Sequence, residues 1–274
     1  MGVVFGLLAA LSIGLSDLFG RRVVHRTGPI SAAVPMQALA FLTSAVTLVF
    51  ISSEWSAGDL IIGLLSGVGL GAGLGCYFAG LNRASSALVA PPVATLSAVV
   101  PLAYSVLRGS SPSVLSWLGT AVCLTGLVLI TVGSRRSASV AVGLLWGVLS
   151  GLGYGFGLSI VLEASDASGS WPAVSQRFAA FFLLLGIARR RGTAAVPPVD
   201  LRLWAVLAGV MAGLSTVFYL LGVAVDETSA VVAASLFPAV SVVVGRRIYG
   251  DEVRVTQAIG VGVVIIGVIA VALG

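Results

Sequence analysis

Asp17 and Arg177 are the charged residues best placed to do chemistry, because each lies within an apolar run. An ionisable side chain inside a membrane segment is a functional candidate by default. Asp17 could carry a coupling proton or contact a substrate, or it could pair with Arg21, one helical turn further on. Arg177 could dock a substrate carboxylate with its planar guanidinium, or it could pair with Glu163 or Asp166.

Five aromatic residues near the middle of apolar runs could line a cavity for an amphipathic or aromatic ligand. Aromatic residues in membrane proteins also serve packing and interface anchoring, so this alternative stays open for each of them. They are Tyr77, Tyr104, Trp146, Tyr154 and Tyr219.

Other kinds of chemistry find no support in the sequence. No glycine-rich loop ending in Gly-Lys-Ser/Thr occurs, so the chain holds no ATPase of that type. His25 is the sole histidine, which excludes a multi-histidine metal site and leaves no evident Ser/His/acid triad. Cys76 and Cys123 lie within apolar segments and are interpreted as small buried hydrophobes. We therefore expect no enzyme activity, no metal and no cofactor.

The composition requires elements that can bury apolar surface in lipid. Only 9% of the 274 residues are charged and 58% are hydrophobic, whereas soluble domains carry roughly 25% charged residues. A helix that crosses the bilayer needs about 20 apolar residues. Ten segments qualify, at approximately 2–20, 32–51, 60–80, 86–107, 114–133, 140–162, 171–188, 203–223, 228–249 and 254–273.

Prolines interrupt two of these segments. Pro91, Pro92 and Pro101 lie in the fourth segment and Pro238 lies in the ninth. Each proline removes a backbone donor, and interrupted helices at corresponding places in two repeats point to a transporter's central site. The four prolines are therefore candidate hinges, or alternatively kinks with a structural role only.

The basic residues predict the orientation of the chain. Thirteen of the fifteen basic residues, all arginines, fall in the loops after the odd-numbered segments. The positive-inside rule places these loops in the cytoplasm and both termini outside, in the inner (plasma) membrane. It explains the arginines better than nucleic-acid binding does, so we expect membrane lipid and no nucleic acid as partners.

The two halves of the chain, residues 1–134 and 138–274, resemble each other. The run Ser86–Ala90 recurs as Ser229–Ala233, and Gly119 with Gly126 recurs at the same spacing later in the chain, as Gly260 with Gly267. Because each half holds five helices, the second copy must enter the membrane inverted, as in many secondary transporters.

The repeat also relates the candidate site residues to one another. Tyr154 occupies the position of Asp17, and Gln37 occupies that of Arg177. The loop after the first helix carries Arg21, Arg22 and Arg26, whereas its counterpart in the second half is acidic. The fold class predicted is therefore an all-α membrane protein of ten helices in two inverted five-helix repeats.

This arrangement resembles the EamA-like branch of the drug/metabolite transporter superfamily. The resemblance rests on Ser86–Ile130 and Ser229–Ile269, each a small-residue helix with prolines, a short turn and a glycine-spaced last helix. The turn Tyr249–Glu252 is similar to the family's Gly-Glu turn, and the first half lacks the acid. The resemblance implies export or exchange of small metabolites, often amino acids or drugs, usually without ATP. It also implies a basic residue at the Arg177 position, from which Gln37 departs.

We expect a secondary transporter that exports a small organic metabolite, such as an amino acid or a drug-like molecule, by alternating access. Asp17 is the expected coupling residue, with protons as a possible second partner. Arg177, Gln37 and the five aromatic residues are the expected substrate contacts. The alternative is a non-transporting membrane scaffold or partner subunit, which predicts a packed centre without a polar-lined cavity. A monomer or a homodimer would fit either function.

Overall fold

The computed structural model describes residues 1–109, 111–133, 138–234 and 236–274, and all the regular elements in these ranges are helices. In chain order they are α1 (Gly2–Thr27), α2 (Pro29–Ala45), α3 (Thr47–Phe50), α4 (Ala57–Leu81), α5 (Ser86–Leu107), α6 (Val114–Gly133), α7 (Ala138–Val161), a short 3-10 turn (Asp166–Ser168), α8 (Trp171–Arg190), α9 (Val199–Ala234), α10 (Phe237–Ile248) and α11 (Val255–Leu273).

The chain is a multi-pass membrane protein. Within the described residues, eight helical spans are long and apolar enough to cross a bilayer, and α6 adds a shorter apolar stretch, Val114–Ile130. Large apolar side chains point outward along these helices; Ile266, for example, is 62% exposed and Val128 is 58% exposed. Such a surface would be unfavourable in water and is stable when lipid tails cover it.

Two features of the helices differ from the sequence prediction. The prolines of α5 were expected to interrupt the helix, yet α5 runs unbroken through Pro91, Pro92 and Pro101. That prediction is wrong because neighbouring helices can hold a helix together around a missing donor. The eighth segment and the start of the ninth follow each other as one long helix, α9, which is kinked at the non-helical residue Asp226. Pro238 then lies in the first turn of α10, where its missing N–H costs little.

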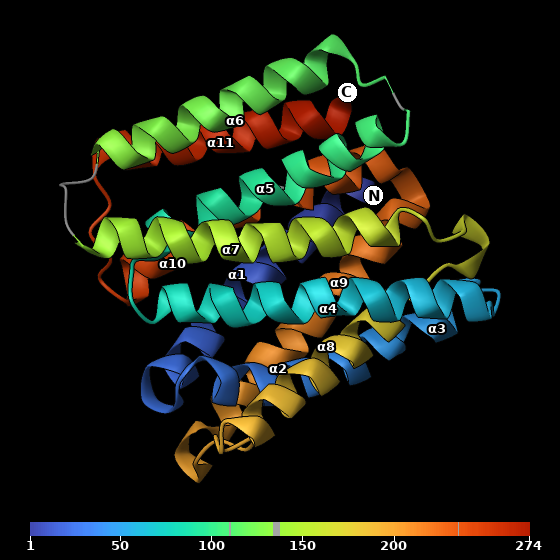
Figure 1. Cartoon of the computed structure of the whole chain (residues 1–274), viewed down its shortest axis with the longest axis horizontal. Coiled ribbons are helices and arrows are strands. Elements are labelled where there is room, and N and C mark those ends of the chain that lie inside the picture. The colour runs from blue at the N-terminus through green and yellow to red at the C-terminus, as the bar shows by residue number, and fades with distance from the viewer. Residues whose placement is uncertain (110, 134–137, 235) are drawn as a thin grey trace.

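Glycines bring the helices into close contact. Helices α4 and α7 cross where a Cβ on Gly69 would lie 2.6 Å from the carbonyl oxygen of Gly153. Helices α6 and α11 meet in the same way, at Gly119 with Gly267 and at Gly126 with Gly260. Small residues at such crossings let the backbones approach closely. Figure 1 shows both helix pairs running side by side.

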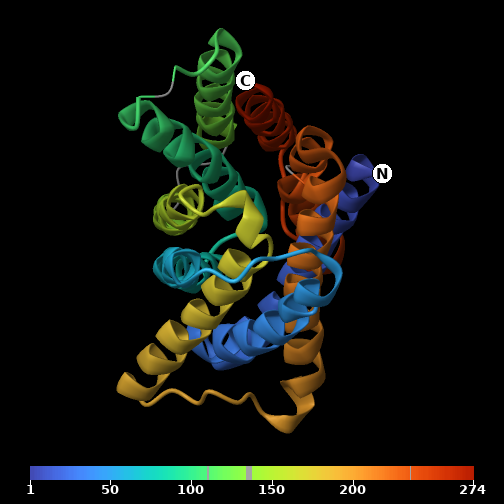
Figure 2. The same cartoon turned by 90° about the vertical axis from the view of Figure 1, so that its right-hand side faces the viewer.

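The helices around the centre of the molecule divide into two groups in the view of Figure 2. In Figure 2, α4, α5 and α7 lie on one side, α1 and α9 lie on the other, and α2 and α8 cross between them. The most extensive packing joins α1 to α9, α6 to α11, and α4 to α7 and α8. Both termini lie at the same end of the helices (Figure 1), as an even number of crossings requires.

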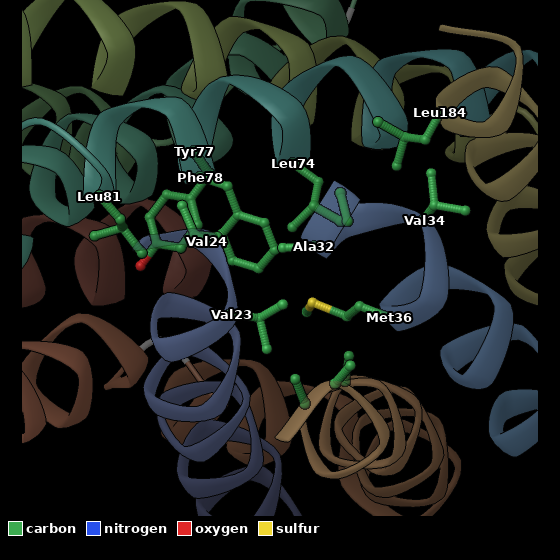
Figure 3. Packing of buried hydrophobic residues seen from close by; sticks show 14 of the residues in the cluster. Val23, Val24, Ala32, Val34, Met36, Leu74, Tyr77, Phe78, Leu81 and Leu184 are labelled. Atoms are coloured by element: carbon green, nitrogen blue, oxygen red, sulfur yellow. The ribbon is translucent and has the colours of Figure 1, made fainter. Parts of the chain in front are cut away.

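An apolar cluster joins α1, α2 and α4 in the lower part of the bundle. Val24 of α1, Ala32 of α2 and Phe78 of α4 are among its buried members (Figure 3). Phe78 packs over Gly20, where a Cβ would lie 2.6 Å from the phenylalanine ring. The cluster fixes the face of α4 that carries Tyr77 against α1, which positions the polar groups described next.

Candidate functional site

A cavity of about 760 Å³ lies between the two groups of helices. Its walls come from α1, α2, α4, α5, α7, α8, α9 and α10. One end reaches Ser165 and Asp166, which are exposed residues in the connection between α7 and α8. The other end stops at Asp17. Ligand pockets typically measure roughly 300–1,000 Å³, so this cavity suits a small organic molecule.

Asp17 is the acidic group at the closed end of the cavity. Its carboxylate Oδ2 accepts hydrogen bonds from the Tyr77 hydroxyl at 2.6 Å and from the Ser241 hydroxyl at 2.5 Å. Three helices, α1, α4 and α10, therefore meet at this one carboxylate. Arg21 is directed away from Asp17 and binds Asp251 instead. The alternative of an Asp17–Arg21 ion pair, suggested by their spacing, is therefore not what the structure shows.

Arg177 is the cationic group of the cavity and projects from α8. Its guanidinium donates to the Gln37 side-chain oxygen at 3.0 Å, to Thr216 Oγ1 at 2.8 Å and to the carbonyl oxygen of Ala212 at 3.3 Å. All three acceptors are neutral. Among the described residues no carboxylate lies within salt-bridge distance of Arg177. A guanidinium left without a counter-ion in a membrane cavity favours an anionic ligand.

Gln37 supports Arg177 from behind. Its side chain is fully buried, and its amide nitrogen has no hydrogen-bond partner among the described residues. Gln37 does not lie on the cavity wall, so its contribution is to hold the Arg177 guanidinium in place. The two residues that the repeat relates to each other thus touch directly.

Tyr77, Tyr154 and Tyr219 line the cavity together with Asp17 and Arg177. They come from α4, α7 and α9 respectively. These aromatic rings, with Leu74 and Val93 between them, form an apolar wall around two charged groups. A few convergent polar groups in a mostly apolar pocket are typical of small-molecule sites.

The comparisons with known proteins agree with this architecture. Residues 1–132 match the sequence model of the EamA-like transporter family. This similarity covers just under half of the chain and supports its placement in the drug/metabolite transporter superfamily. The match indicates a membrane transporter. No functionally curated protein matches it.

A solved crystal structure of a protein shares the fold over 99% of this chain and 96% of that chain, with a TM-score of 0.66 and 17% sequence identity. At this identity the likeness shows the fold alone. The shared fold includes the part of the chain beyond residue 132, which the family model does not match.

Besides Gln37, two more of the expected substrate contacts, Tyr104 and Trp146, are absent from the cavity wall. Tyr104 is near the C-terminal end of α5, where its hydroxyl donates to Glu163 Oε1 at 2.9 Å. Trp146 lies in the N-terminal half of α7, and the Arg83 guanidinium is 5.3 Å from its ring centroid. Each residue was chosen because it lies near the middle of an apolar run. Its side chain, however, contacts a neighbouring element and not the cavity. Depth is visible in a sequence, whereas the rotation of a helix within the bundle is not.

The sequence analysis did not identify three polar residues of the site, Thr216, Gln176 and Ser241. Thr216 lies one turn before Tyr219 on α9, so extending that tyrosine's helical face would have found it. Gln176 lines the cavity beside Arg177 and donates to Ser66 Oγ at 2.5 Å. Ser241 carried no sequence signal, because only the tertiary fold brings α10 to Asp17.

The candidate hinge prolines lie at the edge of the site. Pro92 of α5 is buried and packs where α7 carries Gly147 and Gly151. Val93 and Ser97, further along α5, reach the cavity wall. Pro238 precedes Ser241 by one turn of α10. The prolines therefore stand next to elements that touch the cavity, and their role as hinges stays a prediction.

Proposed function

We propose that the chain is a secondary transporter that exports a small organic metabolite bearing a carboxylate, by alternating access. The observation that carries this proposal is a cavity of about 760 Å³ with a separate acid, Asp17, and a cation, Arg177, that no carboxylate of the described residues reaches at salt-bridge distance. Aromatic side chains form part of the wall around both groups. A scaffold protein would gain nothing from a polar cavity in the membrane, where buried charged groups are costly.

Arg177 is the proposed docking point for the substrate carboxylate. A guanidinium has five N–H donors, and the three hydrogen bonds of Arg177 leave two for a ligand. Gln37 and Thr216 hold the group in place, so a ligand meets a preorganised donor. Tyr154 and Tyr219 supply apolar area for the remainder of the substrate.

Asp17 is the proposed coupling group. Its partners Tyr77 and Ser241 are hydroxyl groups that can donate to a carboxylate or accept from a carboxylic acid. The site can therefore hold Asp17 with or without a proton, without leaving a buried donor unsatisfied. Such a group suits proton exchange as the cavity changes the side to which it opens.

The proposed direction of transport follows from the charge distribution. The exposed end of the cavity reaches the connection between α7 and α8, which the arginine distribution assigns to the outside. The conformation described here then corresponds to an outward-open state with both termini outside. An exporter would release its substrate from this state.

Counterflow in proteoliposomes tests the proposal. Proteoliposomes that contain the purified protein are loaded with one unlabelled compound at a time. The uptake of the same compound in labelled form is then measured for amino acids, other carboxylates, their amides and cationic drugs. Exchange of carboxylates, with weaker exchange of the matched amides, is the expected result. Silence across the panel from folded protein would favour the scaffold function instead.

A further inference from the structure

A polar cluster closes the cavity at the end opposite its mouth. We call Arg21, Ser86 and Asp251 the inner clamp. Arg21 of α1 makes a two-pronged ion pair with Asp251, at 2.7 Å from Nη1 to Oδ2 and 2.9 Å from Nη2 to Oδ1. The backbone N–H and hydroxyl of Ser86, at the start of α5, donate to the same carboxylate at 3.2 and 3.1 Å. The two charged side chains are only 10% and 8% exposed.

The local sequence around Asp251 builds this clamp. Gly250 takes a left-handed conformation, with φ of 66°, two residues after the end of α10 at Ile248. The turn returns the Asp251 N–H to the carbonyl oxygen of Gly245 at 3.1 Å, which directs the carboxylate toward α1 and α5. A Cβ on Gly245 would lie 2.3 Å from Ser86 Oγ and 2.7 Å from Asp251 Oδ2. Glycine at position 245 is therefore needed for the clamp to close.

The aromatic ring of Tyr249 strengthens the seal. The Arg21 guanidinium stacks 4.5 Å from the centroid of this ring, and the Tyr249 hydroxyl donates to the carbonyl oxygen of Leu18 at 2.5 Å. Asp17 lies just above this layer, adjoining Leu18. A ligand in the cavity could reach the face beyond the clamp only if α1 and α10 separated from α5.

A second ion pair joins the matching elements at the opposite end. Arg108, at the end of α5, donates to Glu163, just after α7, at 3.0 Å. Tyr104 donates to the same Glu163, as a tyrosine also accompanies the inner clamp. In the repeat predicted from the sequence, the turn after α5 corresponds to the turn after α10, and the end of α7 to the end of α1. The signs of the charges are exchanged between the two pairs.

The two pairs differ in how completely they are closed. Arg108 and Glu163 are 63% and 36% exposed, in contrast to the nearly buried inner clamp. Ser229 is the counterpart of Ser86, and its N–H and hydroxyl bind Asp226 of its own helix, at 3.2 and 2.6 Å. Ser86 links the two halves of the chain through Asp251 at the inner clamp. The hydrogen bonds described for Ser229 stay within its own half.

We propose that these two ion pairs of opposite polarity are the gates of the transporter. The inner clamp holds the cytoplasmic end shut, and the pair Arg108–Glu163 becomes the buried gate when the clamp opens and the outer end closes. The proposal rests on the proposed function. Gates of matched chemistry keep the two end states close in energy, which a transport cycle needs because a large imbalance would trap one state.

Accessibility of a single cysteine in the cavity tests this proposal without any substrate. Ser97→Cys on α5 lines the cavity midway along its helix and serves as the reporter, with Cys76 and Cys123 replaced by serine. Oriented vesicles are treated with a membrane-impermeant maleimide from either side. The ratio of inside to outside labelling rates is then compared among variants.

The inner-clamp variant is Arg21→Gln/Asp251→Asn, which removes both charges and leaves neither one buried alone. We expect its inside-to-outside labelling ratio to rise at least about tenfold, equivalent to about 1.4 kcal/mol. The outer variant, Arg108→Gln/Glu163→Gln, is expected to lower the ratio about twofold to fivefold, because exposed pairs are weaker.

A matched control is the exposed pair Arg26–Asp200, whose side chains are 65% and 60% exposed. Its double neutral variant is expected to leave the labelling ratio unchanged. Gly245→Ala, which displaces Ser86, is expected to shift the ratio in the same direction as the inner-clamp variant and guards against a folding artefact.

An unchanged ratio in the inner-clamp variant and in Gly245→Ala would overturn the inner gate. A shift of both ion-pair variants in the same direction would overturn the paired-gate proposal. Because labelling needs no substrate, opposite shifts would support the gates even if the compound panel showed no transport. Failure of the proposed function and failure of the gates are therefore distinguishable.

Discussion

Replacing Arg177 by lysine should weaken substrate binding strongly even though the positive charge is kept. The guanidinium donates three hydrogen bonds, to Gln37, Thr216 and the Ala212 carbonyl, and two N–H groups remain for a carboxylate. An ammonium group has three donors in all. The protein acceptors can therefore use every donor of a lysine at this position and leave none for the ligand.

The size of the effect follows from the lost contact. A hydrogen bond to a charged group contributes about 1.5–3 kcal/mol, so losing one such bond weakens binding about 10- to 150-fold. We expect Arg177→Lys to raise the apparent Km for a transported carboxylate within this range. Arg177→Gln, which also removes the charge, should raise it further.

The assay is concentration-dependent counterflow with a carboxylate identified in the compound panel and with its amide analogue. Wild type should prefer the acid, and Arg177→Gln should lose that preference. Arg202→Lys is the matched control, since Arg202 is exposed and lies outside the cavity. An unaltered Km in Arg177→Lys, or equal discrimination between acid and amide in Arg177→Gln, would refute the assignment.

Three further predictions concern the positioning of Arg177, the packing of the helices and the connection between α7 and α8. Thr216→Val removes one acceptor from Arg177 and should raise the substrate Km about threefold to tenfold with a smaller effect on maximal rate; an unchanged Km would contradict a positioning role. Gly126→Leu should destabilise the protein by about 1–3 kcal/mol in detergent melts, because a side chain would collide with α11. Gly262→Leu, which faces open space, should not. Asp59→Ala should cost about 1–3 kcal/mol and expose the 162–170 connection to protease, since Asp59 accepts bonds from the Ser165 N–H and the Ser168 hydroxyl.

The positions of most membrane helices could be predicted from the sequence. The segments predicted at 86–107 and 114–133 coincide with α5 and α6, because polar turns bound each apolar run. The long α9 could not be predicted in the same way. Hydropathy reports the length of an apolar run and is blind to a single non-helical residue such as Asp226.

The candidate site was only partly predictable, for a different physical reason. Asp17 and Arg177 stand out in any apolar sequence, and both line the cavity. Arg21 lies four residues from Asp17, yet it pairs with Asp251, which is 230 positions away. Spacing along a helix identifies possible neighbours, whereas the turn at Gly250 and the packing of α10 decide which pair forms. Tyr104 and Trp146 illustrate the same limit, because helix rotation follows from tertiary packing.

The most direct test of coupled transport is uptake into proteoliposomes with and without a pH gradient, comparing wild type with Asp17→Asn. The proposed function predicts that wild type accumulates substrate when a gradient is imposed. Asp17→Asn should retain substrate exchange and lose gradient-driven accumulation, because an amide can keep its place between Tyr77 and Ser241 but cannot carry the proton. Equal gradient-driven accumulation by both proteins would contradict the role of Asp17 in coupling.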